Sequence, residues 1–106
     1  MNLIGQIITA MIAYYAGDVR RINHFLKVYS FAKTIGEMEG LDESTQEIIE
    51  IAALTHDIGI KNSEKKYNSS AGNYQQIEGP PEAKKLLEGL DIESGVIDRV
   101  CWLIAR

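Results

Sequence analysis

Apolar residues recur every three or four positions along most of the chain, which is the period of an α-helix. No segment alternates apolar and polar residues cleanly over the length of a strand. The pattern therefore predicts an all-α fold, a compact bundle of about five to six helices. Because the chain has 106 residues, close to the usual size of one domain, we predict a single helical domain over residues 1–106.

Glycines and capping residues divide the first half of this pattern into helices. Gly17 ends the first predicted helix, and Asp18 begins the second as an N-cap. Gly40 stops the second helix. Asp42 caps the third, which we expect to run to Gly59.

In the second half of the chain, polar segments, glycines and prolines interrupt the helical pattern more often. Residues 61–73 are predicted to be a polar loop, with one short helical turn as the alternative. Gly79-Pro80-Pro81 is expected to separate a short helix at 74–77 from a longer one. The last helix should begin around 92–94, and it is still in an apolar run at Arg106. The domain is therefore predicted to be incomplete at its C-terminus.

Residues 1–17 carry no charged side chain, which raises the question of a signal peptide or a membrane span. A signal peptide normally begins with Lys or Arg, and a span needs about 20 apolar residues. Gly5, Gln6 and Thr9 interrupt a shorter stretch here, so we expect a largely covered helix and no membrane partner. Self-association through the same face is the alternative, and a homodimer is therefore left open.

Composition and charge limit the classes of partner that the protein is expected to bind. The formal net charge is −4 and the 11 basic residues are scattered, whereas proteins that bind nucleic acid polymers concentrate basic residues in a stripe. We therefore predict no nucleic acid polymer as a partner, although a small phosphorylated ligand fits if a metal ion supplies the positive charge. The one cysteine, Cys101, cannot form an intramolecular disulfide, and a buried reduced thiol is consistent with the cytoplasm.

Two histidines and an aspartate are the candidates for chemistry. His24 lies in the second predicted helix at helical spacing from Val28, and we expect it to point along a buried stripe. The other members of that stripe are Phe31, Ile35 and Met38. His56 and Asp57 come at the end of the third predicted helix, above apolar residues four positions earlier.

Neutral imidazole and carboxylate groups are good ligands for first-row divalent ions, and successive residues at a helix end can reach the same ion. The alternative is structural, because a lone histidine on an apolar face is usually a hydrogen-bonded core residue. Asp57 could equally cap a backbone turn before Gly59. The residues alone leave both readings open.

The segments INHFLKVYSFA and IAALTHDIGI, together with EGPPEA at 78–83, resemble the HD superfamily of metal-dependent phosphohydrolases. The resemblance implies that His24, His56 and Asp57 bind a divalent ion (Mn, Mg, Fe, Ni or Zn) and that Asp57 is catalytic. It implies hydrolysis of a phosphoester or phosphoanhydride bond in a nucleotide or another small phosphorylated metabolite. The later aspartate of the family has no match, since Asp98 precedes the last apolar run. A catalytically silent module that binds a nucleotide or a protein is therefore the alternative.

Relatives also suggest two substrate-binding candidates. Lys61 follows the His-Asp pair closely and could steer a phosphate, with surface solvation as the alternative. Glu78 lies where several relatives place a site residue, although a plain surface glutamate would fit the sequence as well. Lys65 and Lys66 are expected to belong to a solvated loop.

Overall fold

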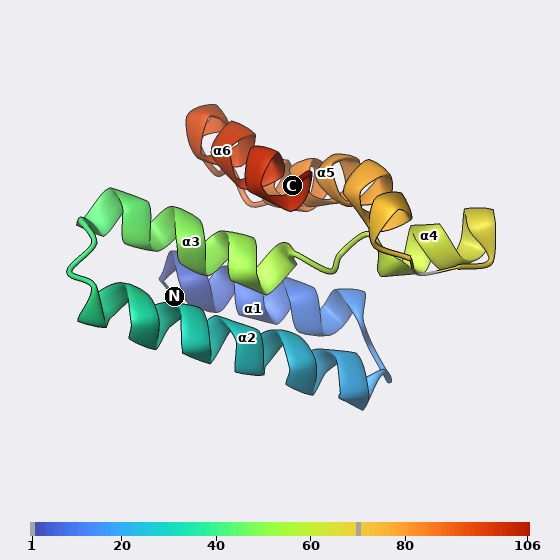
Figure 1. The fold of residues 1–106 in the computed structure, drawn as a ribbon, viewed down its shortest axis with the longest axis horizontal. Coiled ribbons are helices and arrows are strands. Elements are labelled where there is room, and N and C mark those ends of the chain that lie inside the picture. Colours follow the sequence, from blue (N-terminus) through green and yellow to red (C-terminus); the bar gives the residue numbers. More distant parts are fainter. Residues whose placement is uncertain (1, 70) are drawn as a thin grey trace. The chain divides into compact units, whose positions relative to one another are not determined.

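The computed structural model describes residues 2–69 and 71–106. These residues form α-helices and no strand, which confirms the all-α prediction (Figure 1). Two compact units are distinguished, Met1–Leu54 and Thr55–Arg106. The helices are α1 (Leu3–Tyr14), α2 (Val19–Met38), α3 (Glu43–Thr55), α4 (Ile60–Tyr67), α5 (Gly72–Gly89) and α6 (Ser94–Ile104).

The helices of the first unit begin where the capping residues predict. The carboxylates of Asp18 and Asp42 accept backbone N–H groups three residues further on, at 3.1 and 2.7 Å. Gly17 and Gly40 have φ angles of +85° and +69°, which glycine adopts without a steric penalty. Local chemistry therefore fixes both turns of this unit.

The core of the first unit is built on α1. Ile7 and Met11 are fully buried, and Tyr15 just after the helix is nearly so. The ring of Tyr15 lies 6.0 Å from that of Phe25 on α2, centroid to centroid. The sequence predicted a largely covered helix, whereas α1 buries only Ile7 and Met11 and leaves Ile12 42% exposed. No described helix is long and apolar enough to cross a bilayer.

A polar contact joins α2 to α3. The side-chain amide of Gln46 donates to the carbonyl of Lys33 at 3.2 Å and to the carboxylate of Glu50 at 2.7 Å. The same amide lies where a Cβ at Gly36 would be. A side chain at position 36 would therefore displace the Gln46 amide from this contact.

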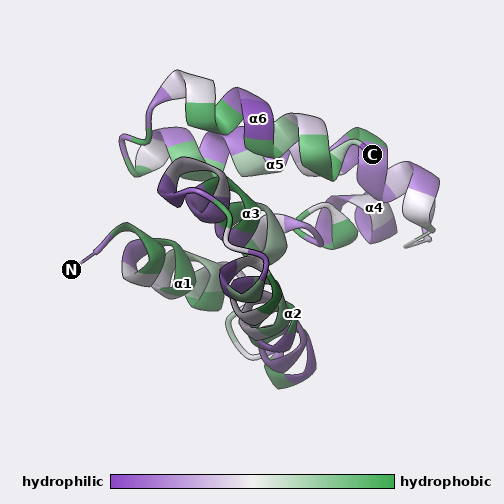
Figure 2. Ribbon diagram, turned by 60° about the vertical axis from the view of Figure 1, so that its left-hand side comes forward, coloured by the Kyte–Doolittle hydropathy of each residue, from purple (hydrophilic) through white to green (hydrophobic). Residues whose placement is uncertain are grey.

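The predicted buried stripe on α2 is wrong. Figure 2 shows hydrophobic (green) and hydrophilic (purple) residues interspersed along α2. His24 is exposed, and three large apolar residues further along the predicted stripe are exposed as well. Their exposed fractions are 57% for Phe31, 59% for Ile35 and 82% for Met38. The helix instead buries Phe25 and Gly36, which lie on another face, three turns apart. Tertiary packing therefore selected a different face from the one that periodicity favoured.

The region after α3 also differs from the prediction. The helix ends at Thr55 rather than near Gly59, and turns occupy the intervening residues. The predicted loop contains a helix of 8 residues, α4, so the helical alternative was nearer to the structure. Asn68 ends this helix in the left-handed conformation, with φ of 54°, which asparagine tolerates better than most residues.

The expected break at Gly79-Pro80-Pro81 is wrong, because α5 runs through both prolines. A residue before proline usually avoids helical angles because its Cβ clashes with the proline ring, and Gly79, the residue before Pro80, has no Cβ. Pro80 itself precedes Pro81 and does have a Cβ, yet it is helical, so the missing Cβ of Gly79 accounts for the first proline only. The α5 and α6 helices pack through buried apolar residues, and the half-buried Cys101 thiol donates to the Pro80 carbonyl at 3.4 Å. The start of α6 agrees with the prediction.

Candidate metal centre

His56 and Asp57 lie in the turn between α3 and α4. Two backbone hydrogen bonds form this turn, from the Ile58 N–H to the Thr55 carbonyl and from the Ile60 N–H to the Asp57 carbonyl, both 3.0 Å long. Thr55 and Ile58 are fully buried, whereas the two candidate ligands are half-buried. Buried anchors on either side therefore present the imidazole and the carboxylate towards solvent.

The two side chains point at each other. His56 Nε2 lies 3.1 Å from Asp57 Oδ2, and the side chains are 34% and 22% exposed. Two adjacent ligands of an octahedral divalent ion, each about 2.1 Å from it, lie about 3.0 Å apart. The donor atoms and their separation therefore fit adjacent ligands of a divalent ion. The same separation suits a hydrogen bond, so an ion would bind to the neutral imidazole in competition with a proton.

The end of this turn is packed directly on α5. A Cβ at Gly59 would lie 2.7 Å from the backbone nitrogen of Gly79, 2.9 Å from its Cα and 3.0 Å from the carbonyl oxygen of Gln75. Gly79 in turn faces Ile104, whose methyl group would lie 2.7 Å from an added Cβ. Only glycine therefore fits at either position without movement of its neighbours, and the turn has a rigid support.

Glu78, a predicted substrate-binding residue, is buried, with 7% of its surface exposed. One carboxylate oxygen lies 3.0 Å from Lys66 Nζ, and the other accepts a hydrogen bond of 3.0 Å from the Tyr67 hydroxyl. The hydrogen bond from Lys66 holds the pKa of Glu78 below its ordinary value, although burial acts in the opposite direction. Its role towards a substrate stays a prediction.

The contact corrects the assignment of Lys66 to a solvated loop, since this lysine lies on α4 and pairs with Glu78. Tyr67 was not a candidate at all. Its ring also stacks on Tyr74 at 4.2 Å between centroids, with an interplanar angle of 9°. No sequence signal joins residues of α4 to residues of α5, because α4 and the first turn of α5 lie in a polar tract without a periodic apolar register.

The other two predicted site residues, Lys61 and His24, lie on α4 and α2. Lys61 is exposed in the first turn of α4, and its role stays a prediction. His24 is exposed in the second turn of α2. It offers one imidazole nitrogen as a ligand atom, and its participation in a site with His56 and Asp57 stays a prediction.

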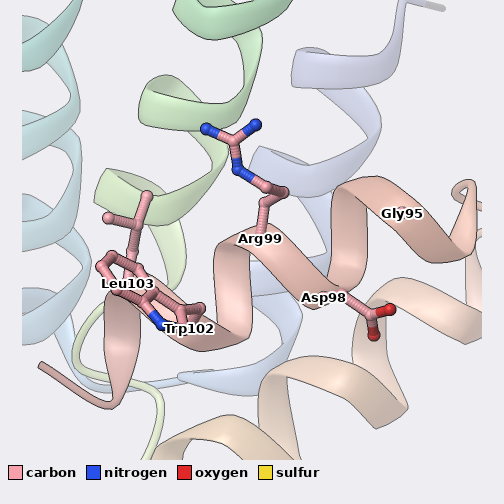
Figure 3. Close-up of a pocket in the computed structure, with 5 residues that line it drawn as sticks. All are labelled: Gly95, Asp98, Arg99, Trp102 and Leu103. Atoms are coloured by element: carbon pink, nitrogen blue, oxygen red, sulfur yellow. The ribbon is translucent and has the colours of Figure 1, made fainter.

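A hollow of about 520 Å³ runs along one face of α6 (Figure 3). It is lined by Gly95, Asp98, Arg99, Trp102 and Leu103. These positions recur at helical spacing, and the figure shows the Arg99 and Asp98 side chains pointing away from each other. Asp98 is an exposed residue of α6.

Comparison with known protein families matches residues 21–106 to the HD domain. The matched region begins in α2 and includes both histidines and the aspartate of the His-Asp pair. No curated protein and no solved structure matches the chain.

Proposed function

Because the chain belongs to the HD domain family, we propose that it is a metal-dependent phosphohydrolase that cleaves a phosphoester or phosphoanhydride bond. The substrate class that we propose is a nucleotide or another small phosphorylated metabolite. The observation that carries the proposal is the pair formed by His56 Nε2 and Asp57 Oδ2, 3.1 Å apart in a half-buried turn. A pair of ligand atoms at this separation is suited to one side of a divalent ion.

His56 and Asp57 would hold the ion, and membership of the family suggests His24 as a further ligand. A divalent ion at such a site supplies Lewis acidity towards a phosphoryl oxygen and lowers the pKa of water towards neutrality. Three protein ligands leave positions for water and substrate, as in catalytic rather than structural sites. The donor set of imidazole and carboxylate suits several first-row ions and does not select one.

The chain's own residues would orient the reaction. We assign to the Asp57 carboxylate, which is half-buried in the turn, the acceptance of a proton from the attacking water. Lys61, exposed one helical turn further on, would contact the negative charge of the phosphate. Such a local cation matters because the formal net charge of the protein is −4, which by itself repels anionic substrates.

The test is hydrolysis of a nucleotide panel by the purified chain with added Mn, Mg, Fe or Ni. Phosphate or nucleoside should be released, and His56→Ala and Asp57→Ala should each abolish the release. Asp98→Ala is the matched control, because it removes a carboxylate from α6 and should leave the rate unchanged. Turnover that survives both substitutions in the turn would refute the proposed site.

Metal binding is measured in parallel by titration of the chelator-treated protein with Mn²⁺. We expect stoichiometric binding that is lost in both variants of the turn. Stabilisation by nucleotides that persists after chelation, without product, would instead favour a silent binding module.

A further inference from the structure

Glu78 and its two partners hold α4 against α5. We call Lys66, Tyr67 and Glu78 the α4–α5 clamp. Each carboxylate oxygen of Glu78 has its own partner at 3.0 Å, and both partners come from the last turn of α4. Because the carboxylate is buried, losing either partner would leave part of a buried charge without compensation. The clamp is therefore sensitive to single substitutions.

Adjacent residues of α5 fix α4 at both of its ends. Gly79 packs against Gly59 immediately before the first turn, and Glu78 holds Lys66 and Tyr67 at the last. The stacking of Tyr67 on Tyr74 adds a further contact at the same end. A short helix held at both ends cannot tilt on α5 without breaking one of these contacts.

The start of α4 is continuous with the His-Asp turn. The N–H of Ile60, the first residue of the helix, donates to the carbonyl of Asp57 at 3.0 Å. A tilt of α4 would therefore move the backbone that carries Asp57. Ligands must be held within about 0.5 Å of the productive geometry for a site to bind its ion well.

From these contacts we infer that Glu78 is a positioning residue, which acts through Lys66 and Tyr67 to set the geometry of the His56–Asp57 pair. The inference rests on the proposed function, since it concerns the same ligand pair. Glu78 touches neither ligand in this arrangement, because the contacts of its carboxylate are to α4. Its effect on the pair is mechanical.

The experiment measures the Mn²⁺ dissociation constant by the EPR signal of free Mn²⁺, at a temperature where every variant is fully folded by circular dichroism. Glu78→Gln and Lys66→Met should each raise the dissociation constant about tenfold, the lower range for residues that support metal ligands. Lys65→Met is the matched control, because Lys65 is an exposed neighbour on the same helix, and it should leave the constant unchanged. Exchange of the two charges, Lys66→Glu with Glu78→Lys, should restore part of the affinity, because it keeps the ion pair but removes the carboxylate that accepts from Tyr67.

The outcomes separate the two proposals. Wild-type binding together with unchanged binding by Glu78→Gln would overturn the positioning role and leave the proposed function intact. A lowered melting temperature with unchanged Mn²⁺ affinity in both single variants would show that the clamp is merely structural, which also overturns the inference. Failure of the wild-type protein to bind Mn²⁺ would remove the proposed function, and the inference with it.

Discussion

Gly59→Ala is the substitution that tests most directly how the His-Asp turn is supported. The added Cβ would lie 2.7 and 2.9 Å from backbone atoms of Gly79 and 3.0 Å from the Gln75 carbonyl oxygen. Real Cβ contacts are essentially never shorter than 3.0 Å. Because these atoms belong to the backbone of α5, no side-chain rotation can relieve the contact, and the turn or the helix must move.

Overpacking of this kind costs about 1–3 kcal/mol in well-packed proteins. For a domain of about this size, each kcal/mol lowers the melting temperature by about 4–8 °C. We therefore expect a visible loss of stability from one methyl group. If the turn moves to relieve the contact, Asp57 moves with it, and Mn²⁺ binding should weaken as well.

The assay is urea unfolding followed by circular dichroism, with Gly89→Ala as the control. Gly89 lies at the end of α5 and has open space around its Cα, so alanine there should raise the free energy of unfolding by about 0.4–1 kcal/mol. Equal stability of Gly59→Ala and the wild type would refute the close packing of the turn on α5.

Three further predictions test the packing inside each unit. The Ser63 hydroxyl is buried with no hydrogen-bond partner among the described residues. Ser63→Ala should therefore raise the free energy of unfolding, measured by urea unfolding, by about 1 kcal/mol. A decrease would show that the hydroxyl is needed. The hydrogen bond from Lys66 holds the pKa of Glu78 below its ordinary value, so the stabilising contribution of Glu78 is present above the ordinary pKa and is lost as the pH falls through the lowered one. The gap in urea midpoint between the wild type and Glu78→Gln should therefore shrink on acidification, and a constant gap would contradict this. Gly36→Ala places a Cβ on the Gln46 amide, which should destabilise the protein by about 1 kcal/mol, and Gln46→Ala should relieve the loss in the double variant.

The sequence predicted best where structure is set by neighbouring residues. Asp18 and Asp42 cap their helices through contacts three residues away, and the positive φ angles of Gly17 and Gly40 belong to the turns themselves. These signals need no knowledge of the rest of the fold. The helices α1 and α2 and the start of α3 followed from them.

The elements that were mispredicted are those whose structure depends on long-range packing. The proline pair was expected to break α5, but the helix runs through both prolines, and only before the first of them does a residue without a Cβ, Gly79, remove the usual clash. On α2 the apolar residues occupy more than one face, and periodicity could not show that the face of Phe25 and Gly36 would be buried. The choice between faces depends on what packs against them.

The difference between features set by neighbouring residues and features set by long-range packing also applies to the candidate site. His56 and Asp57 could be identified because they are adjacent in a recognisable segment, and the structure places their ligand atoms 3.1 Å apart. Lys66 and Tyr67 could not, because their importance comes from a carboxylate 11 residues beyond Tyr67 on another helix. A charged residue in a polar tract is usually solvated, and only burial of its partner shows otherwise.

The burial of Glu78 therefore changes how its position should be interpreted. Glu78 stands at the predicted substrate-binding position, and here each of its carboxylate oxygens already has one partner on α4. An acid that contacts a substrate and an acid that positions α4 respond differently to the exchange of charges with Lys66. Exchange destroys a direct contact with a substrate, whereas it preserves the ion pair that holds the helix, so recovery of Mn²⁺ affinity in the exchanged variant can arise only from the second role.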